Sequence, residues 1–519
     1  MKNKSKIIFL LFSVLLSIPA VLGLFHKGFP LTDDGNWMVI RFSAFYETLR
    51  SGQFPVRFLM RLNNGYGYPV ANFLYPLFMY LGSLIHVLRF SFVDTIKIIL
   101  GISLVSSSVF CFLWLRKIFD NLASLVGSVF YTLIPYHLFD IYKRGSVGEV
   151  LSLAILPFIF WQMERKSFVW VCLGICLLIL SHNTLAALFL PVIFLYMMLN
   201  VSLAKEKKNL LYFYLGEILI GLGLASFFWI PAITDLKYTV FSRVQISNWS
   251  SYFADYNLIG LSTFFILLLV IILIIAGKIE YKKYRLTLLF FVVGIISIFL
   301  AIPASAFLWN FLPVSFIQFP FRLLSITIPC IAFLASCIVS VLSGKKRLVI
   351  AGIILILIII SAGKYLFPGK YQYFPDSFYS TNQDTTTVKN EYMPMWVKTM
   401  PLLMAKSKVE NLNGKEIINI TELTPNETVF EVLLQSPRSI QINTVYFPGW
   451  TAYVNNIQTG IIFNNPSGLI RLNLEKGRNI VSVVFKETGL RFVSNLISAV
   501  SLIILFAIRF LIRRKKFTL

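Results

Sequence analysis

Long apolar stretches separated by short polar segments run along most of the chain. A helix that crosses a bilayer needs about 20 mostly apolar residues, and twelve stretches have this character. They are residues 7–24, 93–115, 121–138, 149–163, 168–181, 184–203, 210–231, 258–277, 286–302, 322–342, 347–363 and 491–512. The pattern therefore predicts a polytopic α-helical membrane protein with about 12 spans.

Two further apolar stretches are excluded from the spans. Residues 72–90 begin Asn-Phe-Leu-Tyr-Pro and contain His86 and Arg89, and residues 303–320 are broken by three prolines. An interfacial helix is the more economical interpretation of the first stretch. Counting it as a span would invert every later loop, so we expect interfacial helices in the first outer loop, residues 25–92.

Lys and Arg gather between the spans. The clusters are residues 2–6, 116–117, 165–166, 205–208, 278–285, 345–347 and 509–516. With the spans above, every cluster falls on one side of the membrane, as the positive-inside rule requires. We therefore expect a plasma-membrane protein with both termini in the cytoplasm. Residues 1–24 show no small-x-small cleavage site and are expected to form an uncleaved first span.

The longest polar segment, residues 364–490, has a strand-like pattern. Residues 439–445 alternate between polar and apolar positions, and the runs 469–474 and 480–485 flank a turn that contains Gly477. This is typical of a β-hairpin within a small β-sandwich. The predicted domains are a transmembrane domain (1–363), an extracytoplasmic β-rich domain (364–490), and the last span with a basic cytoplasmic tail (491–519).

Composition supports a membrane protein and excludes other classes. Hydrophobic residues make up 57% of the chain and charged residues 13%, whereas soluble proteins carry about a quarter charged residues. The net charge of +24 comes mostly from the clusters between the spans. The sequence shows no basic face interleaved with aromatic residues, which a nucleic-acid-binding protein would need. All five cysteines lie in apolar stretches, and the four histidines are scattered. We therefore expect neither outer disulfides nor a zinc site.

The first outer loop holds the densest group of polar residues. If a helix starts near Asp34, then Asp34, Trp37 and Arg41 share one face. Asp33 or Asp34 could act as a general base, or could hold a cation near a phosphate. The alternative is an ordinary interfacial helix whose first turn carries acids that suit the helix dipole.

Further polar groups are expected on the same outer face. They are Arg57, Arg61, Tyr66, Tyr68, Asp140, Tyr142, Lys143, Arg144, Glu149, His182 and Arg322. Lys and Arg residues on the outer face depart from the positive-inside rule. We therefore expect them to bind an anionic partner such as a lipid phosphate. The alternative for each residue is interfacial anchoring. Glu217, an acid within the seventh span, is a further candidate that ranks below the outer acids.

Several of these motifs resemble a known family in their order and spacing. Asp33-Asp34, 49–57, 64–69, 72–76, 142–149, 181–183 and 318–322 resemble the bacterial membrane proteins called 6-pyruvoyl-tetrahydropterin synthase related. Residues 391–394, 446–450 and 468–477 resemble the related YfhO-like proteins. The wider resemblance is to C-type glycosyltransferases, multi-span enzymes with a catalytic Asp in the first outer loop. Pterin synthase chemistry itself is not expected, because it needs a His-rich zinc site.

The resemblance implies roles for the outer residues. Asp33 or Asp34 would deprotonate an acceptor hydroxyl, and Glu149 or His182 would orient the acceptor or the base. The donor phosphate would be held by cations drawn from Lys143, Arg144, Arg57 and Arg322. Trp37, Arg41, Tyr66, Tyr68 and Tyr142 would complete the substrate site.

The donor implied by the resemblance is a polyprenyl-phosphate sugar. The acceptor would be a cell-surface glycan, a wall polymer or a lipid-linked glycan, and a need for a divalent cation is left open. Two other classes remain: a transporter or flippase of lipid-linked sugars, and a non-catalytic scaffold for cell-envelope assembly. A transporter is expected to place charges along a midplane path with repeated halves, whereas here the charges gather at one face. Tyr446, Phe447 and Trp450 could dock a glycan or form part of a sandwich core.

Overall fold

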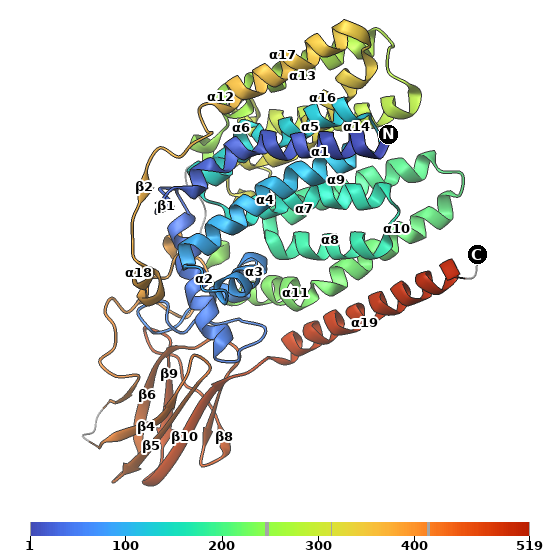
Figure 1. The fold of residues 1–519 in the computed structure, drawn as a ribbon. Helices are drawn as coiled ribbons and strands as arrows, with labels where there is room; N and C mark the ends of the chain where they lie inside the picture. Colours follow the sequence, from blue (N-terminus) through green and yellow to red (C-terminus); the bar gives the residue numbers. More distant parts are fainter. Residues whose placement is uncertain (1, 244–248, 313, 413–415, 518–519) are drawn as a thin grey trace.

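The computed structural model describes residues 2–243, 249–312, 314–412 and 416–517. Parts of the predicted segments, including Pro313 and residues 413–415 of the β-rich region, lie outside the described residues. A bundle of helices carries a β-structure at one end, and both chain ends lie at the opposite end of the bundle (Figure 1). This arrangement agrees with termini on one side of a membrane. The cytoplasmic identity of that side stays a prediction.

Each of the twelve predicted apolar stretches is helical. The helices are α1 (Lys2–Ser17, continued by η1, Ile18–Phe25), α4 (Phe92–Leu115), α5 (Asn121–Leu133, continued by α6, Pro135–Phe139, and η3, Asp140–Arg144), α7 (Val147–Glu164), α8 (Phe168–Ser181), α9 (Asn183–Leu203), α10 (Lys207–Leu224) with α11 (Ser226–Thr234), α13 (Leu261–Ile275), α14 (Tyr281–Ala301), α16 (Leu324–Val341), α17 (Gly344–Ala362) and α19 (Gly489–Phe517).

The described residues contain eight helices long and apolar enough to cross a membrane, or nine if the bent pair α10 and α11 counts as one span. The axes of this pair differ by 70°. α8 and α13 are shorter, with 14 and 15 residues, and three of the first four residues of α17 are basic. The protein is thus a multi-pass membrane protein, and the count of about 12 crossings stays a prediction.

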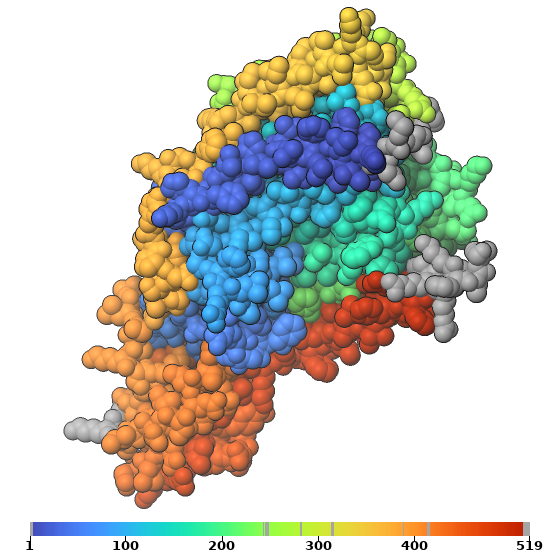
Figure 2. Space-filling model, viewed as in Figure 1, coloured from blue at the N-terminus to red at the C-terminus, as the bar shows by residue number. Residues whose placement is uncertain are grey.

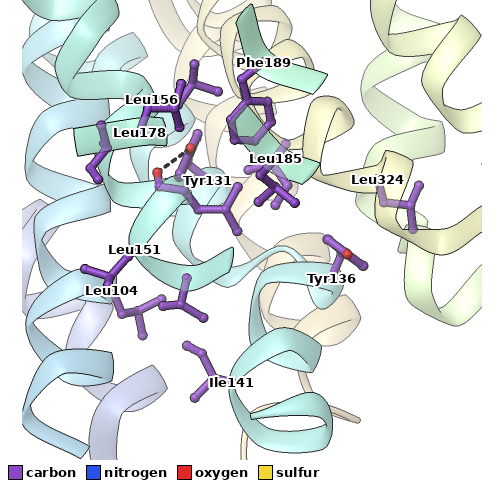
Figure 3. Close-up of a cluster of buried hydrophobic side chains, with 14 of the residues drawn as sticks. Leu104, Tyr131, Tyr136, Ile141, Leu151, Leu156, Leu178, Leu185, Phe189 and Leu324 are labelled. Atoms are coloured by element: carbon purple, nitrogen blue, oxygen red, sulfur yellow. Dashed lines mark hydrogen bonds between the residues drawn. The ribbon is translucent and has the colours of Figure 1, made fainter. Parts of the chain in front are cut away.

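Small and polar residues lie where the helices pack closely against one another. The hydroxyl of Ser13 in α1 lies 2.7 Å from that of Ser108 in α4 and 2.9 Å from that of Ser128 in α5. A Cβ on Gly127 of α5 would lie 2.1 Å from the hydroxyl of Ser336 in α16, so this close approach requires glycine. Such contacts stabilise helix pairs where lipid offers no hydrophobic driving force. Apolar side chains fill the space between the helices (Figure 3).

The first outer loop contains short elements. They are β1 (Phe29–Pro30), α2 (Gly35–Arg50), η2 (Pro69–Asn72) and α3 (Leu77–His86). With 10 residues, α3 is about 15 Å long, which is half the thickness of a bilayer core. This agrees with the exclusion of residues 72–90 from the spans.

Other short elements connect the helices. They are η4 (Asp235–Tyr238), η5 (Phe241–Arg243), η6 (Trp249–Tyr252), α12 (Tyr256–Ile259), η7 (Pro303–Leu308), α15 (Val314–Ile317), η8 (Pro320–Leu323), β2 (Tyr371–Gln372), α18 (Asp376–Thr381) and η9 (Val388–Asn390). β2 pairs with β1. From α17, the chain runs along one side of the bundle toward the β-structure (Figures 1 and 2).

The β-structure is a sandwich of two antiparallel sheets. One sheet has the order β4-β5-β10-β7-β8 and the other β3-β6-β9. The strands are β3 (Val409–Asn411), β4 (Ile418–Leu423), β5 (Glu427–Leu434), β6 (Arg438–Val445), β7 (Trp450–Val454), β8 (Ile457–Thr459), β9 (Leu469–Leu474) and β10 (Gly477–Phe485). Buried side chains of both sheets form one core. The predicted sandwich is confirmed, while the domain limits at residues 363 and 490 stay predictions.

The predicted hairpin between residues 469–474 and 480–485 is wrong. β9 pairs with β6, whereas β10 pairs with β5 and β7 in the other sheet. The turn at Gly477 (φ +115°) therefore connects the two sheets. Both runs face the same core from opposite sides, and alternation in sequence does not distinguish that arrangement from a hairpin.

The first outer loop completes the sandwich core. Phe58, Met60 and Phe73 are buried among the apolar side chains of the strands. Phe447 and Trp450 are buried in the same core. For these two residues the structure supports the core interpretation over glycan docking.

Candidate functional site

A cavity of about 680 Å³ lies where the first outer loop, several helix ends and residues 386–392 meet. This volume is within the usual range for small-molecule sites. Six of the residues singled out from the sequence line it: Asp34, Trp37, Arg41, Arg144, His182 and Arg322. The structure thus brings together residues from four segments far apart in the chain.

Asp34 is positioned at the start of α2. It is the N-cap residue, but its side chain makes no capping hydrogen bond; the hydroxyl of Thr32 accepts the hydrogen bond from the Gly35 N–H instead, at 3.1 Å. The Asp34 carboxylate, with 42% of the side chain exposed, therefore stays available to the cavity. Trp37 and Arg41 line the same cavity, as the helical spacing predicts.

The two acids of the pair have different surroundings. The backbone N–H of Asp33 donates to the carbonyl of Lys143 and that of Asp34 to the carbonyl of Arg144. Asp33 forms an exposed ion pair with Lys143 at 3.1 Å, and neither residue is among those that line the cavity. A Cβ on Gly145 (φ +69°) would lie 2.9 Å from the backbone of Gly35, so glycine is needed where the two segments meet.

A buried charge cluster supports one wall of the cavity. The Oε1 atom of Glu149 lies 3.0 Å from both Nε and Nη2 of Arg322, and Glu149 also forms an ion pair with Arg144. Arg144 contacts Asp140 at 3.1 Å and, toward the cavity, Asp34 at 3.8 Å. Buried charges are stable only when they are paired. Glu149 thus lies behind the two arginines and fixes their orientation.

Further contacts restrict these arginines. Arg322 Nη1 donates to the Ile317 carbonyl at 2.7 Å and to the Gln318 side chain at 2.8 Å. The guanidinium of Arg144 lies 5.5 Å from the centre of the Phe319 ring, and that of Arg322 lies 5.1 Å from it. Planar guanidinium groups held in this way suit recognition of a phosphate.

His182 is held as a neutral side chain. Its Nδ1 atom accepts the Leu185 N–H at 3.3 Å, and its ring lies 4.5 Å from the ring of Tyr75. Burial lowers the pKa of His182 to about 3, although the nearby charge of Glu149 opposes this shift. His182 therefore offers the cavity a neutral imidazole.

Several residues singled out from the sequence do not line the cavity, among them Arg57, Tyr66, Tyr68 and Tyr142. Arg57 contacts Glu487 at 3.1 Å, and the Tyr142 hydroxyl donates to the Ala20 carbonyl at 2.7 Å. The Tyr66 carbonyl accepts the Val445 N–H. Tyr68 is buried and bonds to the hydroxyl of Thr387. These contacts give the four residues roles in the scaffold around the site. Arg57 in particular lies at the junction with the last helix.

Arg41 connects the first outer loop to the segment before the β-sandwich. Its Nε atom donates to the Thr386 hydroxyl at 3.0 Å, and its Nη2 atom contacts the Thr386 carbonyl. Sequence reasoning gave no role to the residues of this segment that line the cavity: Thr386, Lys389, Glu391 and Tyr392. Glu391 and Tyr392 did belong to a motif that resembles YfhO-like proteins. Contacts between residues that are more than 300 positions apart in the sequence produce no local sequence pattern by which they could be predicted.

Another part of the cavity lining is apolar. It is formed by Ala186 and Leu190 of α9, Leu222 of α10, and Trp229 and Ile233 of α11. Ile233 is 66% exposed, so the cavity reaches the surface of the bundle on this side. An apolar opening next to cations suits an amphiphile with an anionic head.

No metal cluster is evident in the part of the chain that the structure describes. Within those residues, no group of three or more His, Cys, Asp or Glu side chains is placed to hold a metal ion. The cavity itself offers the oxygens of Asp34 and Glu391.

A family model described as a 6-pyruvoyl-tetrahydropterin synthase related domain of a membrane protein matches residues 72–366. An uncharacterized protein of Lactococcus lactis subsp. cremoris (strain MG1363) is 26% identical over 267 residues, which are 49% of this chain and 43% of that protein. The chain thus matches less than half the length of this relative.

Two solved structures are similar in part. The mycobacterial arabinofuranosyltransferase AftD has 14% identity and a TM-score of 0.42, covering 71% of this chain and 27% of its own. The Archaeoglobus fulgidus oligosaccharyltransferase tethered with an acceptor peptide has 15% identity and a TM-score of 0.41, covering 75% and 60%.

Proposed function

This chain belongs to the 6-pyruvoyl-tetrahydropterin synthase related family of membrane proteins, and we propose that it is a membrane glycosyltransferase. It moves a sugar from a polyprenyl-phosphate donor to a hydroxyl of a cell-surface glycan, wall polymer or lipid-linked acceptor. One observation carries the proposal: a single cavity combines the Asp34 carboxylate, two oriented arginines and an apolar wall.

Each part of the cavity matches one part of this reaction. The lipid tail lies along α9 and α11, and the donor phosphate lies against Arg144 and Arg322. The acceptor oxygen attacks the anomeric carbon while the bond from that carbon to the phosphate oxygen breaks. The phosphate leaves with the electron pair, and the arginines stabilise its developing charge. Asp34 accepts the proton from the acceptor hydroxyl.

The proposal places the cavity on the outer face of the plasma membrane, with both termini in the cytoplasm. The basic clusters at residues 116–117, 165–166 and 205–208 support this orientation. Alkaline phosphatase fused after residue 363, within the predicted outer segment, is expected to be active, whereas the same fusion after residue 166 is expected to be inactive.

One observation favours a flippase of lipid-linked sugars as the second candidate. α10 and α11 form a helix pair with a bend of 70°, and residues of both helices line the cavity. Transporters often build their sites from such discontinuous helices. Catalysis and transport make different predictions for Asp34, because only catalysis needs a proton acceptor there.

The test measures transfer of radiolabelled sugar from a polyprenyl-phosphate donor pool into surface polymer. Membranes with the wild type are compared with Asp34→Asn and Asp33→Asn at matched expression. Loss of general base catalysis typically costs about 10²–10⁴-fold, so Asp34→Asn is expected to lose at least about 100-fold. Asp33→Asn, the matched control, is expected to retain most activity.

Two outcomes would contradict the proposal. If both variants transfer label like the wild type while deletion abolishes transfer, the Asp pair is structural and the flippase becomes the better explanation. If wild-type membranes transfer no more label than membranes of the deletion strain, the protein is not the transferase. Repeating the assay with EDTA determines whether a divalent cation takes part.

A further inference from the structure

Residues 385–392, which we call the strap, contribute to the wall of the cavity. The strap lies between α18 and the β-sandwich in sequence, and its residues Thr386, Lys389, Glu391 and Tyr392 line the cavity. The strap therefore adds a second acidic residue, Glu391, to the lining of the cavity that Asp34 also lines.

The backbone of the strap has an unusual conformation. Thr386, Lys389 and Asn390 have φ values of +66°, +57° and +52°. Left-handed conformations are unfavourable for residues with a Cβ, and most of all for a β-branched residue such as threonine. Such conformations persist only where surrounding contacts enforce them, and they concentrate at functional sites.

Contacts on three sides enforce the conformation of the strap. Arg41 of α2 bonds to both the hydroxyl and the carbonyl of Thr386. The Tyr68 hydroxyl accepts the Tyr392 N–H at 2.9 Å. The Tyr392 ring stacks between Phe73 and Phe241, with ring centres 5.1 and 5.5 Å away. Glu391 is thus held between two fixed points.

Glu391 lies within electrostatic range of Arg41 and Asp34. Burial raises the pKa of Glu391, the positive charge of Arg41 lowers it, and the negative charge of Asp34 raises it. The two acids are therefore electrostatic neighbours, with Arg41 beside Glu391. A carboxylate repels a phosphate but accepts hydrogen bonds from sugar hydroxyls. This chemistry fits the hydroxyls of an acceptor sugar better than the anionic head of the donor.

We propose that Glu391 is an acceptor-binding residue. Its carboxylate accepts hydrogen bonds from hydroxyls of the acceptor sugar and holds the attacking hydroxyl toward Asp34, while the donor occupies the side of Arg144 and Arg322. The inference rests on the proposed glycosyltransferase function. In this inference, the strap positions the acceptor.

The test separates the two substrates kinetically. Surface polymer extracted from cells that lack the protein serves as the acceptor and is titrated at a fixed level of labelled donor; the donor is then titrated at saturating polymer. A hydrogen bond to a charged group contributes about 10–100-fold to binding. Glu391→Gln is therefore expected to raise the KM for polymer about 10–100-fold, with kcat and the KM for donor changed less than about 3-fold.

Two further variants serve as checks. Asp384→Asn removes the same charge from an exposed residue next to the strap and is expected to match the wild type. Glu391→Asp keeps the charge on a side chain one methylene shorter, and is expected to give an intermediate KM for polymer. This variant also provides the test if Glu391→Gln fails to fold.

The outcomes distinguish this inference from the function on which it rests. If the wild type transfers label but neither Glu391 variant changes the KM for polymer, Glu391 does not bind the acceptor and the glycosyltransferase proposal stands. An equal rise in the KM for donor would also overturn the inference, because Glu391 would then act on the whole cavity. If the wild type shows no transfer, the proposed function itself fails.

Discussion

Replacing Arg491 tests how strongly the β-sandwich, the first outer loop and the cavity wall depend on one another. Arg491 lies at the start of α19 and is fully buried. Its Nε and Nη2 atoms both lie 2.9 Å from Oδ2 of Asp235 in η4, and the amide of Asn72 donates to the same oxygen at 3.0 Å. The guanidinium also lies 5.1 Å from the ring centre of Phe447. One side chain thus joins three segments.

Arg491→Met removes the ion pair of the buried Asp235 carboxylate, which then keeps only the hydrogen bond from Asn72 among the contacts described above. Removing one partner of a buried ion pair costs about 3–5 kcal/mol, because the other charge stays buried without compensation. We therefore expect this loss in the free energy of unfolding. Asp235→Asn combined with Arg491→Met removes both charges and should recover about 1–3 kcal/mol of the summed single losses.

The measurement is denaturant unfolding in mild-detergent micelles, followed by tryptophan fluorescence, for the wild type, both single variants and the double variant. Arg478→Met, which removes an exposed ion pair with Glu431 in the sandwich, is the matched control and should unfold like the wild type. A loss below about 1 kcal/mol for Arg491→Met would refute the reasoning, as would additive losses in the double variant.

Two predictions concern pH. Burial lowers the pKa of Lys408 to about 7, below the value of about 10.4 for a lysine in the unfolded chain. Between these two pKa values the unfolded state binds more protons than the folded state. The free energy of unfolding should therefore rise as the pH increases from about 7 to 10. Lys408→Met should flatten this rise in unfolding curves at pH 7 and 9.5, and an unchanged slope would exclude Lys408 as its source. Because burial lowers the pKa of His182 to about 3, its imidazole stays neutral, and His182→Gln should leave the shape of the pH–activity profile between pH 5.5 and 8 unchanged. Loss of a limb near pH 6.5 in this variant would contradict that assignment.

Local periodicity was sufficient to predict much of the architecture. Apolar stretches predicted the helices because lipid and helix packing both demand continuous apolar surface. The spacing of Asp34, Trp37 and Arg41 predicted a shared face because all three lie on one short helix, and that face does line the cavity.

The remaining features depend on contacts between distant segments. The partners of β9 and β10 depend on which sheet each strand joins, and alternation does not encode this choice. Glu149 looked like a cavity residue but lies behind Arg144 and Arg322, because pairing of buried charges decides its position. No role at the cavity was predicted for the strap, because the partner of Thr386, Arg41, lies 345 residues away in sequence.

The shared core of the first outer loop and the sandwich also has a consequence for biosynthesis. Phe58, Met60 and Phe73 are synthesised early, yet their buried packing partners in the strands begin with Val409, which follows Phe73 by 336 residues. At about 5–20 residues per second, the ribosome needs roughly 20–70 s to cover that distance. During this interval the three apolar side chains lack their final partners. The first outer loop, although among the first segments to be translated, is therefore among the last to complete its fold.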